Sequence, residues 1–175
     1  MAEETGKPQP NYDPFPPGQS SRSMTVEIDA EDMGHMLRRA FTTSHGKFTI
    51  YCDEPEAIGG NGTAPAPLHY FAASILFSEM TQIERYSQLM KVEISSVKAH
   101  VSVHFGLQGS VLAGTIEASA PKVETTYEIE SPDSRERVAA MLRNARNGCW
   151  VRAAVANPTP FEDKSTLNGE PMYFD

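Results

Sequence analysis

The sequence predicts one α+β domain, because segments with the alternating pattern of strands lie on both sides of a long segment with helical spacing. Apolar and polar residues alternate in residues 24–29 and again in several stretches of residues 92–129, and the helical pattern between them covers residues 68–90. A second helical pattern follows, so the order is strands, long helix, strands, helix and a last strand. That order differs from the regular alternation of a parallel fold, and 175 residues fit one domain.

The N-terminal third of the chain is expected to contain a tail and strands. Residues 1–22 hold five prolines and no periodicity, which predicts a disordered Pro-rich tail. Strands are expected at residues 24–29 and 47–52. Residues 30–40 leave two readings open, a short helix or irregular chain.

The long helix is expected to begin at the end of the loop of residues 59–67. Pro65 and Pro67 close that loop, and proline is tolerated in the first turn of a helix, where its missing N–H has no partner to lose. The apolar stripe continues to about Met90. A helix of this length in a small domain is expected to be central and covered on several sides.

The second half of the chain is expected to alternate strands with one helix and to end in an arm. Beyond a short alternating stretch at residues 92–95, the alternating pattern predicts a three-strand antiparallel meander, with strands at residues 97–105, 111–116 and 123–129. A helix is expected from Ser131 to the stop signal Asn147-Gly148. We expect a last strand at residues 149–155 and an extended C-terminal arm over residues 157–175.

Charge and hydropathy exclude two classes of partner. Lys and Arg number 15 against 23 Asp and Glu, and the resulting net charge of -8 does not favour binding to nucleic acid. The longest apolar run, residues 70–77, is far shorter than the roughly 20 residues of a membrane span, so no membrane partner is expected. The first residues are acidic and polar rather than basic and then apolar, which predicts a cytoplasmic protein.

Few catalytic templates are present. The sequence has no Gly-x-Ser-x-Gly elbow, no phosphate-binding loop, no dinucleotide fingerprint and no Cys-x-x-Cys pair, so no cofactor is expected. His100 and His104 share one face of an expected strand but lie about 13 Å apart at ~3.3 Å per residue, too far to ligate one metal. The local sequence around Cys52 and Cys149 favours two structural thiols, and thiol chemistry at Cys149 remains the alternative.

Residues 53–81, DEPEAIGGNGTAPAPLHYFAASILFSEMT, resemble the OsmC/Ohr family. The shared pattern is Asp-Glu-Pro, Gly-Gly, and then Pro-x-Pro leading into a long helix rich in Leu, Ala and Ser. The resemblance extends over residues 23–156, because the order of elements fits and a Cys follows the second helix. It implies an interlocked homodimer, with antiparallel sheets around two central helices and active sites at the subunit interface.

Members of this family typically reduce organic hydroperoxides with a peroxidatic Cys, a resolving Cys, an Arg and a Glu. The resemblance assigns the peroxidatic position to Ser78 and the resolving position to Cys149. It assigns the Glu to Leu68, beside His69, and the Arg to Arg38 or, as the working choice, Arg39. A serine hydroxyl does not ionise near neutral pH and cannot be oxidised and reduced as a thiol is.

The leading hypothesis is therefore an OsmC-like homodimer without ordinary hydroperoxide peroxidase activity. It would keep an apolar pocket at the dimer interface for a small apolar ligand, with wall residues Leu68, His69, Phe71, Ile75, Phe77 and Met80. One alternative is a thiol-dependent hydroperoxide reductase that uses Cys149, a dithiol reductant and, as a resolving partner, Cys52. The other alternative is a non-catalytic interaction subunit that uses its terminal arms.

Overall fold

The computed structural model describes residues 11–174, and their helices and strands follow one another in groups, in the mixed α+β class that the sequence predicts. In chain order the elements are β1 Ile28–Gly34, β2 Leu37–Thr42, β3 Thr49–Cys52, η1 Glu56–Ile58, α1 Pro67–Met90, β4 Ser96–Gln108, β5 Glu117–Glu130, α2 Arg135–Asn147, α3 Trp150–Ala156, β6 Ser165–Leu167 and β7 Glu170–Met172. The pairs β4–β5 and β6–β7 form separate two-stranded sheets, and β1, β2 and β3 form a third sheet in that order. All of the pairing is antiparallel.

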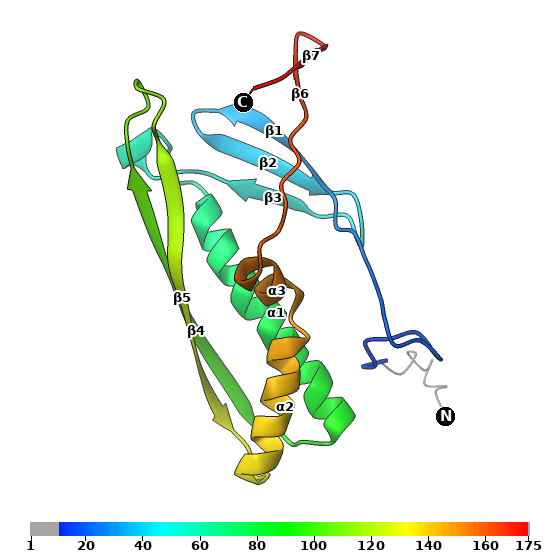
Figure 1. Cartoon of the computed structure of the whole chain (residues 1–175). Helices are drawn as coiled ribbons and strands as arrows, with labels where there is room; N and C mark the ends of the chain where they lie inside the picture. The colour runs from blue at the N-terminus through cyan, green and yellow to red at the C-terminus, as the bar shows by residue number, and fades with distance from the viewer. Residues whose placement is uncertain (1–10, 175) are drawn as a thin grey trace, which may run out of the picture.

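The long helix α1 is the centre of the fold, as its length predicts. The β4–β5 hairpin runs along one side of it, and α2 and α3 pack along another (Figure 1). Pro67 is its first residue, and the backbone N–H of Ala66 donates to Nδ1 of His69 at 3.1 Å, which closes the first turn. A β-hairpin and two helices therefore fix α1.

The hydrophobic core lies where α1, α2 and the β4–β5 hairpin meet. Ile83, Val92, Met141 and Ala145 form its buried cluster, and Met141 has no exposed surface. Tyr127 of β5 packs against this cluster from the hairpin side. The core therefore joins the second half of α1 to α2, and it supports the segment in which α2 ends and α3 begins.

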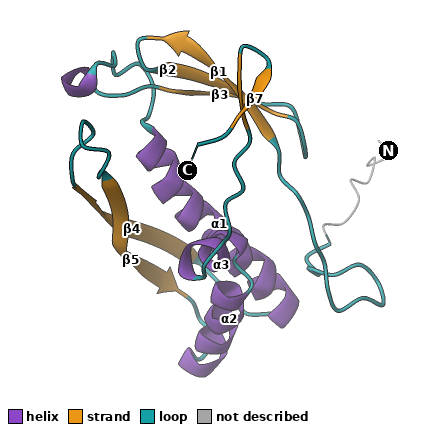
Figure 2. Ribbon diagram, turned by 45° about the horizontal axis from the view of Figure 1, so that its top comes forward, coloured by secondary structure: helices purple, strands orange, loops and turns teal. Residues whose placement is uncertain are grey.

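The N-terminal sheet lies at the start of α1, away from the core (Figure 2). Residues 30–40, which the sequence left open between a short helix and irregular chain, form most of the β1–β2 hairpin. Gly34, His35 and Met36 all have positive φ, and this run of left-handed residues makes the turn. The strand expected at residues 24–29 begins only at Ile28.

The predicted three-strand meander is wrong: β4 and β5 make one long hairpin. The expected strand at residues 111–116 is the turn between them, closed by a hydrogen bond from the Thr115 N–H to the Ser110 carbonyl at 3.0 Å. Gly109 has φ +93, and a Cβ there would lie 1.9 Å from the Thr115 carbonyl oxygen. The tight turn therefore overrides the β propensity of the apolar residues Val111 and Ile116.

The predicted last strand is also wrong, because most of residues 149–155 belongs to the helix α3. Cys149 is the N-cap of α3, and its carbonyl accepts the first helical hydrogen bond from the Ala153 N–H at 3.0 Å. Ala153 and Ala154 are strong helix formers, and the segment packs on α1 rather than pairing with a strand. Alternation over so few residues did not distinguish a strand from two helical turns.

Both ends of the chain contain segments without helix or strand. Residues 11–22 have no regular structure, but the Tyr12 carbonyl accepts a hydrogen bond from Arg85 of α1 at 3.1 Å. The rest of the expected tail, residues 1–10, lies outside the described residues, as does residue 175. The C-terminal arm contains the small β6–β7 hairpin.

A buried carboxylate holds the loop that leads into α1. Asp53 follows β3, has no exposed surface, and accepts hydrogen bonds from the N–H and the hydroxyl of Thr63 at 3.0 and 2.8 Å. It also accepts from the N–H groups of Glu54 at 2.8 Å and Asn61 at 3.2 Å. A Cβ on Gly60 would lie 1.8 Å from the Glu54 carbonyl oxygen, so the loop can close only around glycine. The Asp-Glu-Pro and Gly-Gly motif is therefore structural.

We predict that Asp53 contributes an acid-sensitive part of the stability. The hydrogen bonds from Thr63, backbone first, lower the pKa of Asp53 from 3.8 to about 2. A carboxylate with a depressed pKa stabilises the fold above its unfolded value, and this stabilisation is lost as the pH falls from about 4 towards 2. Asp53→Asn is therefore expected to lower the urea midpoint at pH 7, and its difference from the natural protein should shrink over that interval. Asp29→Asn, which changes an exposed carboxylate, is the control; a difference that persists below pH 2 would contradict the assignment.

Candidate functional site

The structure brings Ser78 and Cys149 together. Ser78 lies in the middle of α1, and Cys149 lies at the junction of α2 and α3, far away in sequence. The Cys149 thiol donates to the Ser78 hydroxyl, with 3.2 Å between Sγ and Oγ, and it accepts the N–H of Arg152 at 3.4 Å. Cys149 is 1% exposed. The two positions assigned by resemblance thus form one polar contact inside the fold.

The backbone at the α2–α3 junction sets the direction of this thiol. Gly148 ends α2, and a Cβ at that position would lie 2.2 Å from the Tyr86 hydroxyl oxygen. Glycine therefore lets α1 approach the junction closely. Because α3 starts immediately afterwards, Cys149 caps a helix N-terminus instead of opening a strand, and its sulfur faces α1.

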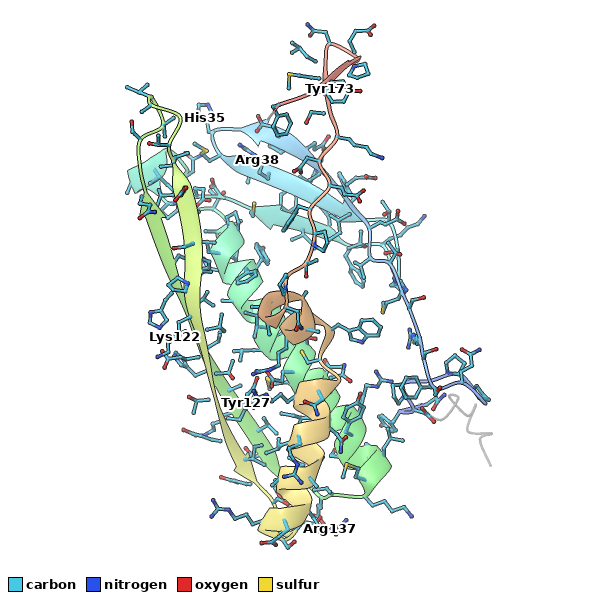
Figure 3. All side chains as sticks on the ribbon, viewed as in Figure 1. His35, Arg38, Lys122, Tyr127, Arg137 and Tyr173 are labelled. Atoms are coloured by element: carbon cyan, nitrogen blue, oxygen red, sulfur yellow. The ribbon has the colours of Figure 1, made fainter. Side chains whose placement is uncertain are left out.

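A buried acid lies next to Ser78. Glu79 is 5% exposed, and its carboxylate accepts a hydrogen bond from the Tyr127 hydroxyl at 2.8 Å. Its other oxygen lies 3.7 Å from the guanidinium of Arg152. Arg152 therefore contacts the thiol through its backbone and the acid through its side chain. In Figure 3, Tyr127 extends from β5 beside the helices that carry these groups.

Tyr127 is held in its protonated form. Burial is the largest cause, and the hydrogen bond to Glu79 adds to it; together they raise the pKa of Tyr127 well above its ordinary value of 10.0. The hydroxyl consequently stays a donor throughout the physiological pH range. One acceptor site of the Glu79 carboxylate is thus permanently occupied.

Sequence reasoning missed Glu79 and Tyr127. A signal for Glu79 existed, because it lies at the i+4 position between Ile75 and Ile83 on the apolar stripe of α1. An acid in a buried stripe requires a partner. Tyr127 offered no such signal, since its partner is 48 residues away and depends on the register of the hairpin against the helix.

Arg39 and Cys52 lie elsewhere in the chain. Arg39 is in β2, where it donates to Glu31 of β1 at 2.6 Å and lies over the ring of Phe41 at 5.0 Å. Arg38 pairs with Asp32 in the same sheet at 2.8 Å, and Figure 3 shows it there. Cys52 is a free thiol at the end of β3, opposite Arg38. None of these three residues contacts Ser78 or Cys149 within the chain.

The six expected pocket residues do not line one cavity within a single chain. Ile75 lines a cavity of about 310 Å³ beside β5, whereas Met80 lines another of about 390 Å³ beside β4. Phe71 packs on Phe105 with 6.1 Å between ring centroids. Leu68, His69 and Phe77 are exposed. These positions therefore remain available to a second chain.

His100 and His104 of β4 have separate hydrogen-bond partners. His104 bonds to Glu124 at 2.9 Å, and His100 bonds to Ser102 at 3.2 Å. Within residues 11–174, no group of three or more His, Cys, Asp or Glu side chains could hold a metal ion. Among the same residues, no helix has the length and apolar character needed to cross a membrane.

Comparison with known proteins finds similarity both to a sequence family and to solved structures. The sequence model of the family described as OsmC-like protein matches residues 60–163. An OsmC-like hydroperoxide resistance protein from Jannaschia sp. CCS1 is 19% identical with a TM-score of 0.57, covering 84% of this chain and 97% of its own. The organic hydroperoxide resistance protein OsmC from Legionella pneumophila is 18% identical with a TM-score of 0.57, and the match covers 77% of this chain and 91% of that protein. An OsmC-like protein from Mycoplasma pneumoniae is 14% identical with a TM-score of 0.60, and the match covers 77% of this chain and 89% of that protein. None of the curated proteins compared with the chain matches it.

We predict that the Tyr127 hydroxyl stabilises the fold through Glu79. Removing it by Tyr127→Phe leaves an oxygen of a buried carboxylate without its donor, which costs about 1–3 kcal/mol of unfolding free energy. Urea denaturation measures this loss. Tyr173→Phe removes the same atom from a side chain that is 92% exposed and should change nothing. Equal midpoints for the two variants would show that the Glu79 contact is not stabilising.

Proposed function

Because the chain belongs to the OsmC-like protein family, we propose that it is a homodimer that keeps the family fold but lacks ordinary organic hydroperoxide reduction. We also propose that a small molecule binds at its dimer interface. The observation that carries this proposal is the contact of the Cys149 thiol with a hydroxyl at Ser78 instead of a second sulfur.

The missing sulfur removes the chemistry that the family resemblance implies. In that chemistry one thiol takes an oxygen atom from the peroxide, releases the alcohol, and becomes a sulfenic acid. A second thiol then condenses with it to give a disulfide and water. The Ser78 hydroxyl can perform neither step, and Cys52 lies in the N-terminal sheet and does not contact Cys149.

Cys149 alone is a poor substitute. A peroxidatic thiol has to meet its substrate, and reactive cysteines are partially exposed. Cys149 is 1% exposed in the single chain, and a second chain can only cover it further. The sulfur is also occupied by Ser78 and the Arg152 N–H. This burial supports a structural or ligand-contacting thiol.

The exposed surface supports a dimer. The chain exposes 14012 Å², whereas a compact monomer of its mass would expose about 8,400 Å². Large apolar side chains contribute to this excess, including Val26, Ile28, Phe48, Tyr51, Leu167 and Phe174. The N-terminal sheet contains or adjoins four of them and packs on little else within the chain. A second copy is the partner that the family resemblance implies.

The central helix presents part of this surface. Leu68 is 55% exposed and Phe77 is 68% exposed, although both belong to the most buried helix of the fold. Phe77 directly precedes Ser78, so a partner that covers it would lie within one helical turn of the Ser78–Cys149 contact. This arrangement supports a pocket shared between two chains.

The first prediction of this proposal concerns hydroperoxide turnover. The natural protein should not consume cumene hydroperoxide in the presence of dithiothreitol, whereas Ser78→Cys should gain turnover. The introduced thiol would replace an oxygen 3.2 Å from the Cys149 sulfur, and a small movement brings two sulfurs to the ~2.0 Å of a disulfide. Oxidised Ser78→Cys should therefore contain an intramolecular disulfide, detected by mass spectrometry as the loss of two hydrogens.

Two further variants control the turnover experiment. Ser74→Cys introduces a thiol one helical turn earlier, at a half-buried position whose hydroxyl bonds to the Phe71 carbonyl, and it should stay inactive. Ser78→Cys combined with Cys149→Ser should lose the disulfide. Turnover by the natural protein that disappears in Cys149→Ser would overturn the proposal and establish Cys149 as a peroxidatic residue.

The second prediction of this proposal concerns the assembly of the dimer. Sedimentation equilibrium should give a mass near twice 19.2 kDa. Phe77→Arg should raise the dimer dissociation constant by at least about a hundredfold, because it buries a charge without a partner in the interface. Leu112→Arg places the same charge on a side chain that is fully exposed at the tip of the β4–β5 hairpin and should leave the mass unchanged. A monomeric natural protein would refute the proposed dimer.

A further inference from the structure

A cavity of about 220 Å³ lies between α1, β5 and the end of α2, next to the Ser78–Cys149 contact. Its polar lining consists of Glu79, Tyr127, Arg146, Arg152 and Thr125. Arg146 is in the last turn of α2 and Arg152 is in α3, so the α2–α3 junction places two guanidinium groups on one cavity. All of these residues belong to one chain.

The charges around the cavity do not balance. Glu79 is the only acid in the lining, and it faces two arginines. Its carboxylate is already engaged, since one oxygen accepts from the Tyr127 hydroxyl at 2.8 Å and the other lies 3.7 Å from Arg152. Among residues 11–174, the Arg146 side chain forms no ion pair and no hydrogen bond. The lining of the cavity therefore includes one arginine with free donors, on an exposed side chain.

The rest of the lining restricts the type of anion. Ile83, Leu142 and Ala145 form the apolar wall of the lining, and the last two precede Arg146 on α2. A guanidinium group matches a planar carboxylate with two parallel hydrogen bonds, and an aliphatic chain on that carboxylate would cover the apolar wall. An inorganic anion would leave the same wall exposed to water.

We propose that this cavity binds a small aliphatic carboxylic acid, whose carboxylate pairs with Arg146 and Arg152 and whose chain lies on Leu142 and Ala145. The inference goes beyond the proposed function, which places a small molecule at the dimer interface. The cavity lies within one chain, and its lining sets the charge of its ligand and contains the residues that select it. The Arg152 N–H contact with Cys149 links the bound carboxylate to the thiol through one residue.

The test is a calorimetric titration of the full-length protein with sodium hexanoate and with hexanamide, which has the same chain without the charge. Hexanoate should bind at least about tenfold more tightly than hexanamide, because charge-assisted hydrogen bonds are the strong ones. Arg146→Gln should remove most of this difference, and it is expected to fold, since Arg146 is exposed and unpaired among the described residues. Arg143→Gln, one turn earlier on α2 and outside the cavity lining, should bind like the natural protein.

Each result other than the expected one would contradict one specific part of the proposals. Equal binding of hexanoate and hexanamide, no binding of hexanoate, or equal losses in Arg146→Gln and Arg143→Gln would overturn the carboxylate site. Inorganic phosphate that binds as tightly as hexanoate would overturn the role of the apolar wall. Hydroperoxide turnover by the natural protein would overturn the proposed function alone, because hexanoate binding that depends on Arg146 would still stand.

Discussion

The position of the candidate site depends on one buried carboxylate. Asp53 ties the end of β3 to Asn61 and Thr63, and so it fixes where the chain turns before α1 begins. The residue has no exposed surface, and it is stable there because each of its oxygens accepts hydrogen bonds. Once the start of α1 is fixed, the distance along the helix determines the depth at which Ser78 meets Cys149. The conspicuous loop motif therefore acts on the site through geometry.

The second constraint is the approach of α1 to the α2–α3 junction. Gly148 has no side chain, so Tyr86 of α1 can lie close to the end of α2. Cys149 follows directly and caps α3. A cap residue has an extended backbone, which turns the chain and directs the thiol to α1. The same turn brings Arg146 and Arg152 to one cavity from two different helices. The thiol contact and the positive charge of the cavity thus have a common structural cause.

The sequence predicted the parts of the fold that depend on long periodic patterns or on strong end signals. The α1 helix satisfied both conditions, with Pro67 at its start and a stripe that continues to Met90. The short segments were ambiguous: residues 111–116 and 149–155 alternate like strands, but tight-turn geometry decided the first and helix capping the second. The Ser78–Cys149 pair came from resemblance. Glu79 had a signal in the apolar stripe of α1, whereas its partner Tyr127 had none, because that contact depends on tertiary packing.

The polar groups beside the thiol differ from those that the family resemblance implies, and the difference is systematic. The expected acid position is Leu68, and the expected arginines pair with Asp32 and Glu31 inside their own sheet. An acid and an arginine nevertheless occur beside Cys149, as Glu79 and Arg152, from other elements of the fold. Because Glu79 is buried and already bonded, this pair gives a fixed polar environment, and the excess positive charge comes from Arg146. Such an environment supports the proposed binding of an anion.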